Sequence, residues 1–153
     1  MIRPATPADV DEIHTLVCEL AEFENLRHTV AATPADIHAA LFGQRPVLEA
    51  LVAPAPAPAS SPDTLSGVAL FYPTFSTFTG KPGLWLEDLY VRPEFRGQGL
   101  GTAFLQRFLD LARHRGCARA EWAVLAWNQP ALRRYESLGA DVMPDWRIAR
   151  LNL

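Results

Sequence analysis

The feature that most constrains the fold is an apolar run that stops at a proline and passes through a glycine-rich loop into a helix. The apolar run covers residues 84–91, and the loop carries Arg96, Gly99 and Gly101 in an R-x-x-G-x-G arrangement. Glycines have no Cβ, so successive backbone N–H groups of such a loop can converge on one ligand. The unpaired N–H groups and the positive dipole end of the following helix favour an anion at the same place. The pattern therefore predicts a phosphate-sized anion site between strand and helix.

Two better-known phosphate loops do not fit this stretch. A Walker A loop ends in Gly-Lys followed by Ser or Thr, whereas Thr102 follows Gly101 directly. The dinucleotide fingerprint is G-x-G-x-x-G, whereas Gly97, Gly99 and Gly101 are spaced G-x-G-x-G. A glycine-rich turn that only begins a helix is the remaining alternative.

Length and composition indicate one soluble domain. The chain has 153 residues, of which 49% are hydrophobic and 20% charged, so residues 1–153 are predicted to form a single domain around one core. No stretch reaches the ~18 to 20 uncharged apolar residues of a membrane span, and the sequence opens without a signal-peptide pattern. A cytoplasmic location is expected, with no membrane or nucleic-acid partner. Neither the two cysteines nor the four histidines have metal-ligand spacing, so no metal is predicted.

The charges are divided unevenly along the chain. Residues 1–91 carry 4 Lys or Arg against 11 Asp or Glu, whereas residues 92–153 carry 10 against 6. One interpretation is a basic half for a polyanionic cofactor and an acidic half for a cationic substrate. The other is that these charges lie on solvated faces by chance.

Capping residues and hydrophobic periodicity place the helices. Thr6 and Thr33 are each followed by a proline and, three residues on, by an aspartate, so each is expected to cap a helix. A central helix is predicted over residues 100–115. A last helix is predicted between Asn128, which can cap its start, and Gly139, which ends it.

The strands complete an α/β order of elements. The proline-rich residues 54–64 are predicted to form a long hairpin loop, and the apolar run at 118–127 a strand covered on both faces. Further strands are expected at residues 2–3, 47–53, 65–75 and 84–91, with one or two closing strands in 143–153. The order predicts a mixed, mainly antiparallel sheet of six to seven strands flanked by about four helices.

Residues 96–101 resemble the acyl-CoA pyrophosphate loop of the GCN5-related N-acetyltransferases, whose pattern is Gln/Arg-x-x-Gly-x-Gly/Ala. With the stretches at 2–6, 19–24, 86–90 and 123–140, the chain is similar almost end to end to the diamine (spermidine/spermine) N-acetyltransferases. The resemblance implies the GNAT-type fold and acetyl transfer from acetyl-CoA to a primary amine of a small di- or polyamine. It implies direct attack in a ternary complex. Thialysine and other amino-acid-amine enzymes share much of the pattern, so acetylation of an amino-acid side-chain amine is the alternative. A non-catalytic acyl-CoA-binding module is a third.

The resemblance also assigns the cofactor contacts. The loop would bind the pyrophosphate, backbone N–H groups of the fourth strand and Asn128 would bind pantetheine, and Tyr135 would lie at the CoA sulfur. The implied cofactor-binding residues are Leu89, Tyr90, Val91, Arg96, Gly97, Gln98, Gly99, Leu100, Gly101, Asn128 and Tyr135.

Acyl transfer to an amine needs a neutral amine and a protonated leaving thiolate. By resemblance Tyr135 is the general acid for the sulfur, and Glu87 accepts a proton from the ammonium. Strand alternation puts Glu87 and its neighbour Asp88 on opposite faces. The alternatives are a packing role for Tyr135 and a solvated strand position for Glu87.

The implied substrate-binding residues are Glu24, Glu87, Asp88 and Trp146. Trp146 is equally consistent with a buried core position. After Glu24, residues 25–28 replace an acidic stretch of the family, which removes counter-charge for a polycation as long as spermine. The family usually pairs through its C-terminal strands, and residues 146–153 alternate apolar and polar side chains, so a homodimer is predicted.

Overall fold

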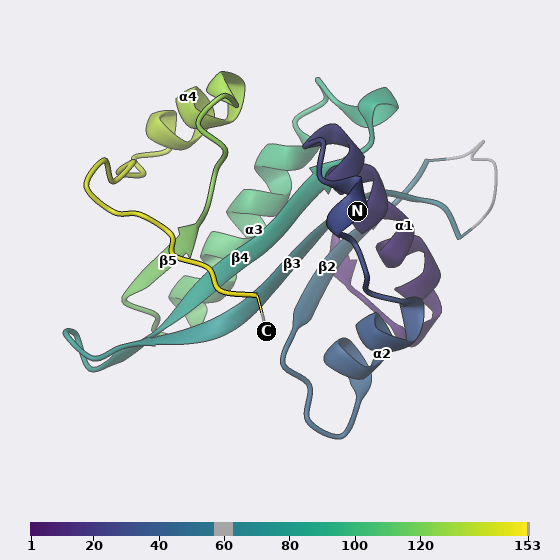
Figure 1. Ribbon diagram of the computed structural model, residues 1–153, viewed down its shortest axis with the longest axis horizontal. Helices are drawn as coiled ribbons and strands as arrows, with labels where there is room; N and C mark the ends of the chain where they lie inside the picture. Colours follow the sequence, from purple (N-terminus) through teal and green to yellow (C-terminus); the bar gives the residue numbers. More distant parts are fainter. Residues whose placement is uncertain (57–62, 153) are drawn as a thin grey trace. The chain divides into compact units, whose positions relative to one another are not determined.

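The computed structural model describes residues 1–56 and 63–152 (Figure 1). The chain divides into two compact units, Met1–Trp122 and Ala123–Leu153, and each is described by itself. The predicted hairpin loop at 54–64 includes residues 57–62, which lie outside the described part. The assignment of residues 1–153 to a single domain stays a prediction.

The first unit contains one mixed β-sheet with the strand order β1-β2-β3-β4-β5. Neighbouring strands are antiparallel except β4 and β5, which are parallel and connected through helix α3. The strands are β1 (Arg3–Pro4), β2 (Glu49–Pro54), β3 (Leu65–Ser76), β4 (Lys81–Val91) and β5 (Arg119–Trp122). The predicted α/β class and the mixed, mainly antiparallel sheet are confirmed.

The described residues contain four α-helices, the number predicted. Three short 3-10 turns, at Pro7–Asp9, Arg27–Thr29 and Pro93–Phe95, lie between the longer elements. The helices of the first unit are α1 (Val10–Phe23), α2 (Pro34–Phe42) and α3 (Leu100–His114), and that of the second unit is α4 (Gln129–Ser137).

Helices cover both faces of the sheet (Figure 1). On one face Ile13 and Leu16 of α1 belong to the same buried cluster as Val68 of β3 and residues of α2. On the other face Phe108 of α3 contacts Phe71 of β3, with ring centroids 5.6 Å apart. Burying a large apolar side chain contributes about 1.5–3 kcal/mol, so these two layers supply most of the stability of the sheet.

Two copies of the same capping motif begin the first two helical segments. The carboxylate of Asp9 accepts hydrogen bonds from the backbone N–H and the hydroxyl of Thr6, at 2.7 and 2.8 Å. Asp36 accepts the same pair from Thr33, at 2.8 and 2.7 Å. Asp9 also accepts two 2.8 Å hydrogen bonds from Arg3, which extend the first cap into an ion pair. The predicted caps are confirmed.

The sheet has five strands in the described residues, fewer than the six or seven expected. Residues 143–152 form no strand there, although they alternate as a strand would, because alternation becomes a strand only when a neighbouring strand supplies hydrogen bonds. β5 is shorter than the predicted 118–127 and is not buried on both faces. Arg119 and Glu121 form a 2.7 Å ion pair on it, and such charges keep a strand at a surface.

Candidate active site

A β-bulge interrupts strand β4 at Glu87. Asp88 pairs with Leu70 of β3, whereas the next residue of β3, Phe71, pairs with Leu86. Glu87 is therefore the extra residue and has no pairing partner on β3. Bulges re-aim side chains and are frequent beside active sites, which makes this position a candidate for part of the active site.

Glu87 and Asp88 lie on the same face of the sheet, so the expectation that they point to opposite faces is wrong. Asp88 shares its face with Leu70, which packs in the cluster under α1 and α2. Trp85 pairs with Tyr72 on that face, and its Nε1 donates a 2.9 Å hydrogen bond to Oε2 of Glu87. The bulge is the reason, because side chains alternate between faces only in a regular strand.

Three carboxylates form a cluster on this face. Burial, followed by the nearby charges of Glu87 and Glu24, raises the pKa of the Asp88 carboxyl to about 6. Burial also raises the pKa of Glu24, the residue that follows the last turn of α1. None of the ion pairs among the described residues includes these three carboxylates. The acid cluster of Glu24, Glu87 and Asp88 is therefore suited to a cationic ligand.

The last residues of β4 have a strand partner on one side only, within the described part of the chain. β5 pairs with residues 83–86 of β4 and no further. Leu89, Tyr90 and Val91 pair with β3 on their other side. An edge of this kind offers backbone N–H and C=O groups to an extended ligand. The predicted pantetheine contacts thus lie on a strand edge that suits them.

Two glycines with positive φ shape the loop at residues 96–101. The φ angles are 76° at Gly97 and 80° at Gly99, a region that glycine adopts without steric cost. A Cβ added to either would meet no protein atom within 4 Å, so the space beside the loop is open to a ligand. Gly99 caps α3, and the first helical hydrogen bond runs from the N–H of Ala103 to the carbonyl of Gly99, so the N–H groups of Leu100 and Gly101 have no acceptor within the helix. Together with Gln98, these residues make up the loop for which an anion site is predicted, and its open side and helix N-terminus are compatible with a pyrophosphate.

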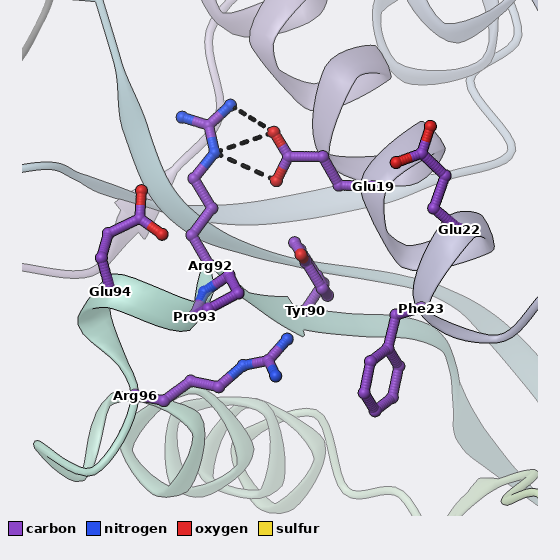
Figure 2. A pocket seen from close by; sticks show the side chains of 8 residues that line it. All are labelled: Glu19, Glu22, Phe23, Tyr90, Arg92, Pro93, Glu94 and Arg96. Atoms are coloured by element: carbon purple, nitrogen blue, oxygen red, sulfur yellow. Dashed lines mark hydrogen bonds and ion pairs between the residues drawn. The ribbon is translucent and has the colours of Figure 1, made fainter.

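A pocket of about 420 Å³ opens between α1 and the end of β4, beside the start of this loop (Figure 2). Arg96 extends into it, and its Nε donates a 2.8 Å hydrogen bond to the carbonyl oxygen of Val91. Its guanidinium lies 5.1 Å from the ring centroid of Phe23 and 5.4 Å from that of Tyr90. The remaining lining residues are Glu19, Glu22, Arg92, Pro93 and Glu94. Arg96 therefore connects the loop to α1.

Arg92 fixes one wall of this pocket, and the sequence analysis missed it. Its Nη2 donates to Glu19 at 2.9 Å, its Nη1 donates to Glu12 at 3.0 Å, and the same Nη1 donates to the carbonyl of Leu65 at 2.9 Å. The Arg92 side chain is 11% exposed, so the ion pairs tie α1 to the sheet away from bulk water. Its partners Glu19 and Glu12 are 73 and 80 residues away in sequence, and no local pattern joins them.

The remaining predicted site residues belong to the second unit. Oδ1 of Asn128 accepts a 3.4 Å hydrogen bond from the N–H of Ala131, so Asn128 caps α4 as predicted. Tyr135 is half-buried on α4, and burial raises the pKa of its hydroxyl. Trp146 is 74% exposed, so the alternative of a buried core tryptophan is wrong. Their roles toward the thioester and the amine stay predictions.

No helix within residues 1–56 and 63–152 is long and apolar enough to cross a membrane. In the same described residues, no group of three or more His, Cys, Asp or Glu side chains is arranged to hold a metal ion.

The fold recurs in solved acetyltransferases. A structure described as a probable acetyltransferase superposes with a TM-score of 0.77 at 24% identity, covering 100% of this chain and 97% of its own. An acetyltransferase of Trypanosoma brucei superposes with a TM-score of 0.75 at 22% identity, covering 100% and 99%. These likenesses establish the acetyltransferase fold.

The sequence comparison defines the family. Residues 18–140 match the model of the acetyltransferase (GNAT) family, and the chain belongs to this family. It is an N-acetyltransferase, of a family that uses acetyl-CoA as co-substrate. The resemblance drawn from the loop and the β4 motif is thereby confirmed.

Three named relatives carry the names of amino-acid or polyamine acetyltransferases. Thialysine N-epsilon-acetyltransferase of Mus musculus is 41% identical over 91% of this chain and 82% of its own length. L-ornithine N5-acetyltransferase of Arabidopsis thaliana is 33% identical over 98% and 83%. Spermidine/spermine N(1)-acetyltransferase-like protein 1 of Homo sapiens is 34% identical over 99% of this chain and 22% of its own.

Proposed function

We propose that this N-acetyltransferase transfers the acetyl group of acetyl-CoA to the side-chain amine of an amino acid such as thialysine, lysine or ornithine. The observation that supports it is the acid cluster beside the bulge of β4, which is suited to one ammonium group. The relatives that are 41% and 33% identical carry the names of thialysine and ornithine enzymes. From the sequence, this substrate class is the alternative to a small di- or polyamine. The cytoplasmic location stays a prediction.

A small di- or polyamine is the second candidate, since one relative is a spermidine/spermine acetyltransferase-like protein. A long polycation needs free negative charge along its length. Beside the pocket, however, Glu19 pairs with Arg92 at 2.9 Å and Glu22 lies 4.0 Å from Arg27. Much of the acidic charge outside the acid cluster is thus already compensated. The arrangement favours a substrate with a single ammonium at its reacting end.

The loop at residues 96–101 would bind the pyrophosphate of acetyl-CoA through its backbone N–H groups. The open edge at Leu89, Tyr90 and Val91 would bind the pantetheine arm, with Asn128 as a further contact. When bound, acetyl-CoA supplies an activated acyl group. The chain then has to orient the amine, remove its proton and protonate the departing sulfur.

Two side chains would move the protons. Glu87 accepts a proton from the substrate ammonium, directly or through water, which gives a neutral nucleophile. The amine then attacks the acyl carbon directly, the bond from that carbon to sulfur breaks, and the attacking nitrogen gives up a second proton, which replaces the one that Tyr135 loses. Tyr135 donates its hydroxyl proton to the sulfur, and because burial raises the pKa of Tyr135 it remains protonated at neutral pH. No covalent enzyme intermediate is involved.

Steady-state acetylation of a panel of amines with acetyl-CoA tests this proposal. The panel contains thialysine, lysine, ornithine, putrescine, spermidine and spermine, and mass spectrometry locates the acetyl group on each product. We expect the highest kcat/KM with an amino acid and modification of its side-chain amine. A higher kcat/KM with spermidine than with any of the amino acids would favour the hypothesis of a polyamine substrate. Binding of acetyl-CoA without turnover of any amine would contradict the proposal and leave a binding module.

A further inference from the structure

The bulge at Glu87 also leaves the backbone of this residue without a pairing partner on β3. A residue in a regular strand is held by ladder hydrogen bonds, whereas the extra residue of a bulge has no partner opposite. A group that takes a proton from a substrate must nevertheless be held in one geometry, since a small displacement costs much of its effect. The orientation of Glu87 therefore has to come from its side-chain contacts.

Two aromatic side chains supply those contacts. Tyr72 and Trp85 pair directly across β3 and β4, on the face that carries the acid cluster. The indole Nε1 of Trp85 donates to Oε2 of Glu87 at 2.9 Å, and the hydroxyl of Tyr72 is hydrogen-bonded to the same carboxylate. Both rings are half-buried, whereas Glu87 is exposed. The two donors thus hold the carboxylate from the sheet side and leave its other side open.

The donors are neutral, and this determines what the carboxylate can still do. An arginine or lysine in their place would compensate the charge of Glu87 and compete with a substrate ammonium. A phenol and an indole N–H use two of the roughly four acceptor sites of a carboxylate and leave its charge intact. None of the ion pairs of the described residues involves Glu87. The carboxylate is therefore oriented and still negative.

We propose that Tyr72 and Trp85 are positioning residues that orient the Glu87 carboxylate toward the acceptor amine. The inference rests on the proposed function, in which Glu87 accepts the proton of that amine. Asp88, on the same face, is more buried than Glu87 and is less accessible to a ligand. The two aromatic donors thus select the exposed carboxylate of the pair for contact with substrate.

Removing one donor at a time tests the inference. Trp85→Phe removes the indole N–H and Tyr72→Phe removes the hydroxyl, while each variant keeps an aromatic ring in the cross-strand pair. We expect kcat/KM for the amine to fall about 10- to 100-fold in each variant, the span of a hydrogen bond to a charged group. The dissociation constant of acetyl-CoA, measured by calorimetry, should stay within about twofold, because neither ring lies on the loop.

The second arm separates positioning from a purely structural role. In a Glu87→Gln background, Trp85→Phe should change kcat/KM by less than about twofold, because its effect acts through Glu87. Phe75→Leu, at an exposed position on β3, the strand of Tyr72, is the control for disturbance of the hairpin and should keep wild-type kinetics.

The outcomes distinguish the positioning role of Tyr72 and Trp85 from the proposed function. Equal losses from Trp85→Phe with and without Glu87, or wild-type kinetics in both phenylalanine variants, would overturn the positioning role and leave the proposed function intact. No turnover by the unmodified enzyme would instead defeat the proposed function. If one variant fails to fold by circular dichroism, the other carries the test alone.

Discussion

At the scale of single residues, Asp9 is a carboxylate whose two oxygens both accept hydrogen bonds. It accepts hydrogen bonds from Arg3 and from the backbone and hydroxyl of Thr6, and its side chain is 8% exposed. The hydrogen bonds from Arg3 are the main reason that its pKa is lowered to about 2. The ionised form of Asp9 therefore stabilises the folded state.

This shift predicts how stability depends on pH. The folded pKa lies below the ordinary value of 3.8, so the contribution is complete above about pH 4 and is lost as the pH falls from there to about 2. Asp9→Asn should lower the free energy of unfolding by about 2 kcal/mol at pH 7 and by little at pH 2. Urea denaturation at both pH values measures this.

Asp36 provides the matched control for Asp9. It has the same hydrogen bonds from its capping threonine, but none from an arginine, and its pKa is also lowered. Asp36→Asn should therefore cost less stability than Asp9→Asn. An equal loss from both variants would show that the capping bonds, and not Arg3, carry the effect.

The positive-φ glycines give a second prediction at this scale. Gly99→Val and Gly80→Val each place a side chain at a backbone position with positive φ and with no protein atom near the new Cβ. Each should cost about 1–2 kcal/mol of folding free energy through the left-handed backbone. Only Gly99→Val should weaken binding of CoA, by at least about tenfold, because Gly80 lies in the hairpin between β3 and β4. Calorimetry showing equal CoA affinity in the two variants would remove the loop from the cofactor site.

At the scale of elements, α4 carries the predicted general acid. Tyr135→Phe should leave the affinity for acetyl-CoA near that of the unmodified enzyme, because the ring is kept. It should lower kcat by about 10²- to 10⁴-fold, the usual span for a general acid. Steady-state and binding measurements on the same preparation check both parts. An ordinary kcat across pH 6 to 10 would return Tyr135 to a packing role.

The elements also show what a sequence can predict and what it cannot. The helix starts at Thr6 and Thr33 and the loop at Gly99 were predictable, because caps and positive φ depend on residues within a few positions. The bulge at Glu87 was not, since it is a property of the pairing between β3 and β4. The contacts of Arg92 with α1 could not be predicted from the sequence either, because they join residues far apart in the chain.

In the candidate site, too, residue identities could be predicted from the sequence, whereas features that depend on strand pairing could not. The sequence named Glu24, Glu87 and Asp88 through a family motif, which marks residue identity, and the structure brings these three carboxylates together. Their roles toward the substrate stay predictions. The prediction placed Glu87 and Asp88 on opposite faces, because it assumed a regular strand. It did not identify Tyr72 and Trp85, whose function depends on the cross-strand pair and on the exposed carboxylate beside it.

At the scale of the whole molecule, the C-terminal stretch predicts self-association. Trp146, Ile148 and Leu151 are 74%, 71% and 83% exposed, and this much apolar surface on one short stretch is costly in water. The predicted homodimer would cover it. Light scattering at assay concentration should give twice the 16.9 kDa mass of the chain. The doubly substituted variant Ile148→Asp and Leu151→Asp should shift the mass toward that of a monomer, and a monomeric unmodified protein would contradict the prediction.

The central claim is that the acceptor amine loses its proton at the bulge of β4 and then attacks acetyl-CoA. The most direct test is kcat/KM for thialysine with Glu87→Gln, alongside Glu49→Gln as a control on strand β2. The account predicts a loss of about 10²-fold or more for Glu87→Gln, unchanged affinity for acetyl-CoA, and wild-type kinetics for Glu49→Gln. Undiminished kcat/KM in Glu87→Gln would contradict it.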